Sequence, residues 1–147
     1  MITGNALGNP FPRAVRTIGV FAPAGVAEPA RLERGLARLR GWGLEVALAG
    51  PVGPAERFLA ASDERRACAL NELLRNPQVD VLLAARGGYG CGRILEMLDL
   101  EGLKARAIPL IGYSDVTALH AAAFARGCRT TSPGRWSATP CLGNRRT

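Results

Sequence analysis

The tetrapeptide Gly112-Tyr113-Ser114-Asp115 places a hydroxyl where a nucleophile would be useful. It follows an apolar run and precedes a helix-forming one, so it should form a sharp strand-to-helix turn. A hydroxyl on such a turn projects into a cleft, and N–H groups of the next helix can hold the oxyanion formed when serine attacks a carbonyl. The fit to the G-x-S-x-G elbow is partial, because Val116 replaces the last glycine. Taken alone, the tetrapeptide favours a simpler interpretation, in which Ser114 is only a helix N-cap.

The second candidate is a glycine-rich loop, Arg86-Gly87-Gly88-Tyr89-Gly90. Glycines let a backbone approach a ligand closely and turn its N–H groups inward. With Gly92, the segment has more glycines than a plain strand-to-helix turn needs. It lacks the Gly-Lys-Ser/Thr of a phosphate-binding loop and the G-x-G-x-x-G spacing of a dinucleotide site. Arg86 could pair with a substrate carboxylate, or it could tie down the loop through a structural contact with a carbonyl group.

Short apolar runs alternate with helical patterns four times along the chain. This alternation predicts an α/β fold, a mostly parallel sheet flanked by helices, with the nucleophile elbow as a strand-turn-helix unit. Ligands gather at the carboxyl ends of such strands, so the two loops should share one cleft. In the helix over 62–75, Cys68 belongs to the apolar stripe and should be buried. Strands are expected at 17–23, 44–49, 79–85 and 107–112, and helices at 28–42, 62–75, 93–98 and 115–126.

The net charge of +7 comes mainly from the end of the chain. All 12 acidic residues lie at or before Asp115, and the charged residues after it are all arginines. A DNA-binding face would be a basic stripe on a folded element, so this distribution argues against nucleic acid as a partner. Residues 129–147 have no sustained periodicity, and we expect this tail to be irregular and poorly ordered.

The composition also disfavours a metal site and a membrane protein. Zinc needs clustered ligands, whereas the four cysteines form no CxxC pair and the one histidine, His120, lies 8 residues from Cys128. No apolar run approaches the ~20 residues that span a bilayer. The first ten residues lack the basic and apolar regions of a signal peptide. We therefore expect a cytoplasmic protein with no metal and no membrane partner.

Taken together, the two loops resemble the serine LD-carboxypeptidases, peptidases of cell-wall recycling that include the microcin-immunity hydrolases. The segments 18–25 and 61–66 also resemble that family's first strand and its pre-helix segment. The likeness divides the chain into an N-terminal extension (1–15), the family's N-terminal α/β domain (16–128) and an aberrant tail (129–147). The motifs that carry it are Arg86-Gly87-Gly88-Tyr89-Gly90, Leu98-Asp99 and Ile111-Gly112-Tyr113-Ser114-Asp115-Val116-Thr117-Ala118-Leu119-His120.

The resemblance implies a role for each matching residue. Ser114 would be the nucleophile, and the backbone N–H groups of Gly88 and Asp115 would form the oxyanion hole. The family releases terminal D-alanine from muramoyl tetrapeptides in peptidoglycan recycling, so the substrate would be a small muropeptide. No metal and no other cofactor is implied, and a homodimer is an option for the full-length family form. The substrate pocket would be lined by Arg86, Gly87 and Tyr89.

Serine attack also needs a general base. In the family, the histidine and glutamate of the triad come from a C-terminal domain, which has no counterpart in these 147 residues. His120 follows Ser114 by six residues on the same predicted helix. At ~100° and ~1.5 Å per residue it should point away from the elbow and serve in helix packing. We therefore expect this chain alone to be inactive.

Two alternatives stay open. A non-catalytic module could keep the peptide cleft and bind muropeptides without cleaving them. The chain could also be a truncated, frameshifted pseudogene product, because the family usually has a Gly-Pro-Met segment where this sequence has Pro133-Gly134-Arg135-Trp136-Ser137. Codons for Gly-Arg-Trp-Ser can contain Pro-Met-Val in another frame, so a slip near 129–134 would explain the missing acidic residues and the excess of arginine. The nucleotide sequence of the gene decides this point.

Overall fold

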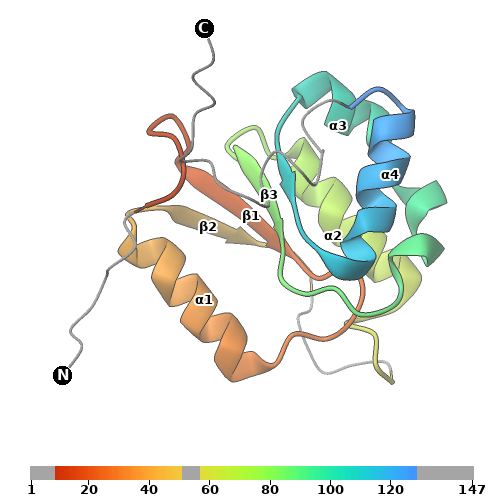
Figure 1. Ribbon diagram of the computed structural model, residues 1–147, viewed down its shortest axis with the longest axis horizontal. Coiled ribbons are helices and arrows are strands. Elements are labelled where there is room, and N and C mark those ends of the chain that lie inside the picture. The colour runs from red at the N-terminus through yellow and green to blue at the C-terminus, as the bar shows by residue number, and fades with distance from the viewer. Residues whose placement is uncertain (1–8, 51–56, 129–147) are drawn as a thin grey trace, which may run out of the picture.

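A computed structural model describes residues 9–50 and 57–128. These residues form a four-stranded, wholly parallel sheet with helices on both faces (Figure 1). The predicted α/β class is therefore confirmed. The tail expected to be irregular, 129–147, lies outside the described residues.

The strands run in the order β2-β1-β3-β4 across the sheet. Because all of them are parallel, their carboxyl ends lie along one edge, where the loops after β1, β3 and β4 meet. The strands are β1 (Thr17–Phe21), β2 (Glu45–Leu48), β3 (Val81–Ala84) and β4 (Leu110–Ile111). The helices are α1 (Pro29–Gly41), α2 (Asp63–Arg75), α3 (Leu100–Arg106) and α4 (Thr117–Ala125), with 3₁₀ turns η1 (Cys91–Arg93), η2 (Leu95–Met97) and η3 (Ser114–Val116).

The sheet separates two apolar cores. Helix α1 lies on one face, and α2, α3 and α4 lie on the other (Figure 1). Alternate residues of β1 point to opposite faces, as a strand requires: Ile18 and Val20 pack in the α1 core, whereas Phe21 packs in the core under α2. Such burial on both faces is the usual environment of a parallel strand and explains its continuous apolar run.

Local sequence accounts for the ends of α2. The Oγ of Ser62 accepts a hydrogen bond from the N–H of Arg65 at 3.3 Å, and two acidic residues follow in the first turn. These are the preferred residues at the positive end of a helix dipole. At the other end, the guanidinium of Arg106 donates to the carbonyl groups of Leu73, Leu74, Asn76 and Val79.

The sequence-based expectations were wrong at three places. The helix expected at 93–98 is two 3₁₀ turns, and the neighbouring helix α3 was not expected. The carboxylate of Asp99 caps α3 by accepting from the N–H of Gly102 at 2.8 Å, a signal that the glycine inside this short helix obscured. Cys68 is exposed, not buried, because the buried face of α2 carries Arg66, Leu70 and Leu73, and Cys68 lies off that face.

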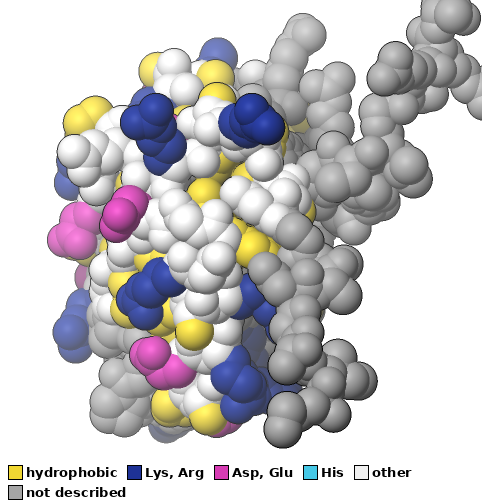
Figure 2. Space-filling view, turned by 90° about the vertical axis from the view of Figure 1, so that its left-hand side faces the viewer, with side chains coloured by type: hydrophobic (Ala, Val, Ile, Leu, Met, Phe, Trp, Pro, Cys, Tyr) yellow, Lys and Arg dark blue, Asp and Glu magenta, His cyan; other side chains and the backbone are white. Residues whose placement is uncertain are grey.

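None of the described helices is long and apolar enough to cross a membrane. Charge is mixed on the face shown in Figure 2, where Lys and Arg side chains are interspersed with Asp and Glu side chains instead of forming one stripe.

Candidate active site

Ser114 occupies the tight turn that joins β4 to α4. Its φ of 59° is in the left-handed region, which non-glycine residues rarely adopt and which often marks functional sites. The side chain is exposed at the carboxyl edge of the sheet. Tyr113 holds the N-cap position of η3 and Val116 that of α4, so Ser114 does not cap either helix. The geometry is that of a strand-turn-helix elbow.

The glycine-rich loop after β3 lies directly against this elbow. A methyl group on Gly87 would come within 3.0 Å of the Cβ of Ser114, 3.1 Å of the carbonyl oxygen of Tyr113 and 3.4 Å of the amide nitrogen of Asp115. A side chain at this position would force its neighbours to move by a few tenths of an ångström, so glycine suits the close approach. Two loops 20 or more residues apart in sequence therefore form one surface.

Two backbone donors at this surface are available to a ligand. Among the described residues, neither the N–H of Gly88 nor the N–H of Asp115 donates a hydrogen bond to an acceptor. Gly88 has a φ of 113°, a backbone conformation that favours glycine. The N–H of Asp115 lies at the start of the helical segment formed by η3 and α4, where the dipole favours negative charge. Both features suit an oxyanion hole.

The side chain of Asp115 has a different task from its backbone. Its Oδ2 accepts a hydrogen bond of 2.8 Å from the backbone N–H of Cys91. This bond connects the end of the glycine-rich loop to the elbow. Cys91 is fully buried. Burial, followed by the hydrogen bond to Asp115 and the negative charge of that residue, raises the pKa of Cys91 to about 12. A thiol with such a pKa is not a nucleophile at neutral pH.

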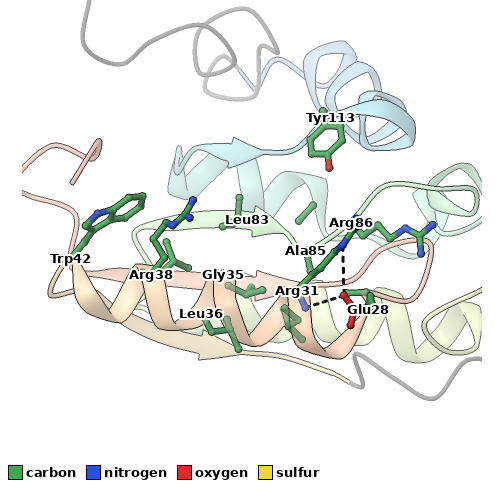
Figure 3. Close-up of a pocket in the computed structure, with 15 residues that line it drawn as sticks. Glu28, Arg31, Gly35, Leu36, Arg38, Trp42, Leu83, Ala85, Arg86 and Tyr113 are labelled. Carbon is green, nitrogen blue, oxygen red and sulfur yellow. Dashed lines mark hydrogen bonds and ion pairs between the residues drawn. The ribbon is translucent and has the colours of Figure 1, made fainter. Parts of the chain in front are cut away.

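A cleft of about 510 Å³ opens beside the elbow, between α1 and the end of β3. Figure 3 shows Arg86 and Tyr113 at one end of it and Trp42 at the other. The Nη1 of Arg86 donates to the carbonyl oxygen of Val26 at 2.6 Å, so the structural contact considered for this residue is present. Because a guanidinium has five N–H donors, the rest of the group can still meet a carboxylate.

Tyr89, predicted to line the substrate pocket, is not among the described residues that line this cleft. It is exposed, and its ring packs against the exposed ring of Phe58 with centroids 6.0 Å apart. Phe58 was not identified from the sequence, because one exposed aromatic residue after a loop carries no distinctive pattern. The pair gives the candidate site an apolar flank.

Arg66 is the most important residue that the sequence analysis did not single out. Its side chain is buried and donates hydrogen bonds to carbonyl groups of three loops around the site. A signal was present: Arg66 precedes Leu70 and Leu73 by four and seven residues, so helical periodicity places it on the buried face of α2.

His120 lies in the core under α4, as expected for a packing residue. Its ring is 2% exposed, and Nε2 donates to the carbonyl oxygen of Leu110 at 3.1 Å. The other ring nitrogen, Nδ1, is buried and has no partner among the described residues. Burial lowers the pKa of His120 from its usual 6.5, against an opposing effect of the Leu110 contact. This ring cannot serve Ser114 as a base without leaving the core.

A buried neutral histidine should make stability depend on pH. Protonation of Nδ1 would bury a charge and a donor without an acceptor, so the stabilising contribution is complete above the unfolded pKa of 6.5 and is lost as pH falls below it. His120→Gln keeps a donor for Leu110. We expect it to reduce the slope of the free energy of unfolding against pH by at most about 1.4 kcal/mol per pH unit. Urea unfolding from pH 7.5 to 5 measures this. Equal slopes for both proteins would contradict the assignment.

The described residues contain no group of three or more His, Cys, Asp or Glu side chains arranged to hold a metal ion. Of the cysteines in the described part of the chain, Cys91 and Cys128 are buried and Cys68 is exposed.

Comparison with known proteins identifies the family. Residues 18–132 match the model of the LD-carboxypeptidase N-terminal domain. The chain therefore belongs to the LD-carboxypeptidase family.

Relatives with similar sequences and solved structures agree with this assignment. The murein tetrapeptide carboxypeptidase of Pseudomonas aeruginosa is 34% identical over 111 residues, which cover 75% of this chain and 36% of that protein. The structure of muramoyltetrapeptide carboxypeptidase from Oxalobacter formigenes has a TM-score of 0.69 at 34% identity, covering 76% of this chain and 37% of that one. The structure of the microcin C7 self-immunity protein MccF in complex with aspartyl sulfamoyl adenosine, a protein known from Escherichia coli, has a TM-score of 0.74 at 30% identity, with 83% and 37% coverage. The chain spans about a third of the length of the curated relatives it matches.

Proposed function

We propose that this chain is the nucleophile-bearing half of a serine LD-carboxypeptidase that releases terminal D-alanine from muramoyl tetrapeptides during peptidoglycan recycling in the cytoplasm. Two relatives are named for murein tetrapeptide and muramoyltetrapeptide carboxypeptidases, which supports this substrate class. The observation that carries the proposal is the joint presence of Ser114 in a left-handed turn and the two backbone donors without acceptors beside it.

In the proposed mechanism, the Oγ of Ser114 attacks the carbonyl carbon of the peptide bond before D-alanine. The carbonyl π electrons move to oxygen, and the N–H groups of Gly88 and Asp115 donate to the resulting oxyanion. The C–N bond then breaks, a proton passes to the leaving amine, and water hydrolyses the acyl-enzyme. The exposed part of Arg86 would pair with the carboxylate of the terminal D-alanine.

The proton of Ser114 must pass to a base that lies outside the described residues. The chain has one histidine, and that ring is buried against Leu110. The complementary groups would come from the part of the relatives that this chain does not span, about two thirds of their length. The 147-residue chain alone would then bind the tetrapeptide but not cleave it.

The test joins residues 1–128 to the C-terminal remainder of the P. aeruginosa relative and measures D-alanine release from muramoyl tetrapeptide. We expect release by the fusion and none by its Ser114→Ala variant. The 147-residue chain should bind the tetrapeptide saturably without releasing D-alanine. Release that persists in Ser114→Ala would overturn the role of this serine. Binding without release by every form would support a non-catalytic binding module instead.

A further inference from the structure

The guanidinium of Arg66 joins three segments that meet at the carboxyl edge of the sheet. Its Nε donates to the carbonyl oxygen of Ala61 at 3.0 Å. Its Nη1 donates to two carbonyl oxygens, that of Gly90 at 3.0 Å and that of Pro23. One nitrogen therefore links the loop after β1 to the glycine-rich loop after β3.

This side chain is held firmly in place. Its exposed fraction is 1%, and its Nη2 donates to Oδ1 of Asp63, so the buried charge has a counter-ion. Asp63 also accepts from Arg93, with Nη2 of that residue 2.9 Å from Oδ2. A buried guanidinium with an acid and several carbonyl acceptors satisfies the usual condition for burying charge.

The two loops joined by Arg66 also bond to each other next to the elbow. The N–H of Gly25, in the loop after β1, donates to the carbonyl oxygen of Gly87 at 3.1 Å. In a trans peptide the C=O and the following N–H point in opposite directions. The Gly25 contact therefore fixes the 87–88 peptide and turns the N–H of Gly88 away from Gly25, free for a ligand.

Close packing shows how little the arrangement can shift. A methyl group on Gly25 would lie 3.0 Å from the carbonyl oxygen of Gly87. One on Gly90, whose φ is 138°, would lie 2.7 Å from Cδ2 of Leu59 and 3.1 Å from Nη1 of Arg66. The peptide group between Gly90 and Cys91 is held at both of its polar groups. Its C=O accepts a hydrogen bond from Arg66, and its N–H donates one to Asp115.

We propose that Arg66 is a positioning residue of the active site, which sets the orientation of the Gly87–Gly88 peptide by holding the loops after β1 and β3 together. It would touch no substrate and would act on the two loops through their backbone carbonyl groups, with Asp63 as its counter-ion. The inference rests on the proposed function for its catalytic consequence, although the orientation itself can be measured without activity.

The first measurement is amide hydrogen exchange on the 147-residue chain. In Arg66→Lys and Arg66→Met, exchange of the Gly25 N–H should rise at least tenfold relative to the N–H of Leu82, which bonds to Pro109 within the sheet. Arg106→Lys is the matched control, because Arg106 also donates to several carbonyl groups but at the far end of α2. That variant should leave the ratio unchanged even if it lowers the melting temperature.

The second measurement uses the fusion described above. Arg66→Lys should lower kcat by about 10²-fold, the effect of losing one oxyanion donor, with KM within twofold, whereas Arg106→Lys should leave kcat unchanged. A Gly25-to-Leu82 exchange ratio that stays the same in folded Arg66 variants would overturn the proposal. So would a faster Gly25 exchange with an unchanged kcat. An inactive parent fusion would count against the proposed function alone, since the exchange ratio still decides whether Arg66 orients the loop.

Discussion

The 147-residue chain by itself should release D-alanine from muramoyl tetrapeptide far more slowly than ~1 per second, the lower end of ordinary turnover. Its one histidine is buried and bonded to Leu110, so Ser114, the proposed nucleophile, would have to attack as a neutral hydroxyl. A positioned base contributes ~10²–10⁴-fold. Removing triad members can leave ~10³–10⁴-fold over the reaction in water, supplied by oxyanion donors and binding.

The comparison is between the purified chain, its Ser114→Ala variant and the fusion to a relative's C-terminal remainder, with D-alanine measured by a coupled oxidase. The first two should be indistinguishable, and the fusion should gain at least 10²-fold through Ser114. The prediction fails if the chain alone turns over at ~1 per second or faster and this activity is lost in Ser114→Ala. That result would show that the chain supplies a general base other than the groups described around Ser114. Rescue only in the fusion identifies Ser114 as a competent nucleophile.

The alternation of apolar runs and helical patterns was sufficient to predict the sheet, because the central strands β1 and β3 are buried on both faces and so have continuous apolar runs. Ser62 and the acids after it marked the start of α2 in the same way. Helix α3 was less accessible to such reasoning. It is short, contains Gly102, and is stabilised by the cap from Asp99 and by packing against α2 and α4, which only the folded chain provides.

The sequence alone is also a poor guide to which residues at the edge of a buried helix face are themselves buried. Cys68 was expected in the core because it was assigned to the apolar stripe of this helix. The structure instead places Arg66 there, at the position that lines up with Leu70 and Leu73. A charged residue is accepted because carbonyl groups from other segments converge on it. These carbonyl groups come together only in the folded chain, so the sequence of α2 alone does not indicate them.

For the candidate site too, the sequence predicted some features and missed others. The unusual glycine content of 86–92 and the serine after β4 indicated that both loops mattered, and parallel topology placed them at one edge. The sequence did not reveal the left-handed φ of Ser114, the Asp115 to Cys91 bond or the Phe58 to Tyr89 contact. The two contacts join segments that are far apart in the chain, and a left-handed φ is too rare at serine to be expected from its residue type.

Contact between the two loops gives the second prediction with a large effect. Gly87→Ala should lower kcat of the fusion by about 10-fold, less than the ~10²-fold that a misplacement of roughly 1 Å can cost. The added methyl group would lie 3.0 Å from Cβ of Ser114 and 3.4 Å from the amide nitrogen of Asp115, so these neighbours must move by a few tenths of an ångström. Because the φ of Gly87 is not in the left-handed region, the backbone accepts alanine and the fold should persist.

Gly92→Ala is the matched control, since a methyl group there meets no atom within 4 Å. It adds the same group to the same segment, and its kcat and KM should equal those of the parent fusion. Circular dichroism melts of the three proteins establish that Gly87→Ala remains folded. A folded Gly87→Ala fusion with kcat within twofold of the parent would mean that the spacing between the glycine-rich loop and Ser114 does not control the reaction. The expected pattern is a fall in kcat in that variant alone, with KM nearly constant, because the displaced donors meet the substrate oxygen most strongly in the transition state.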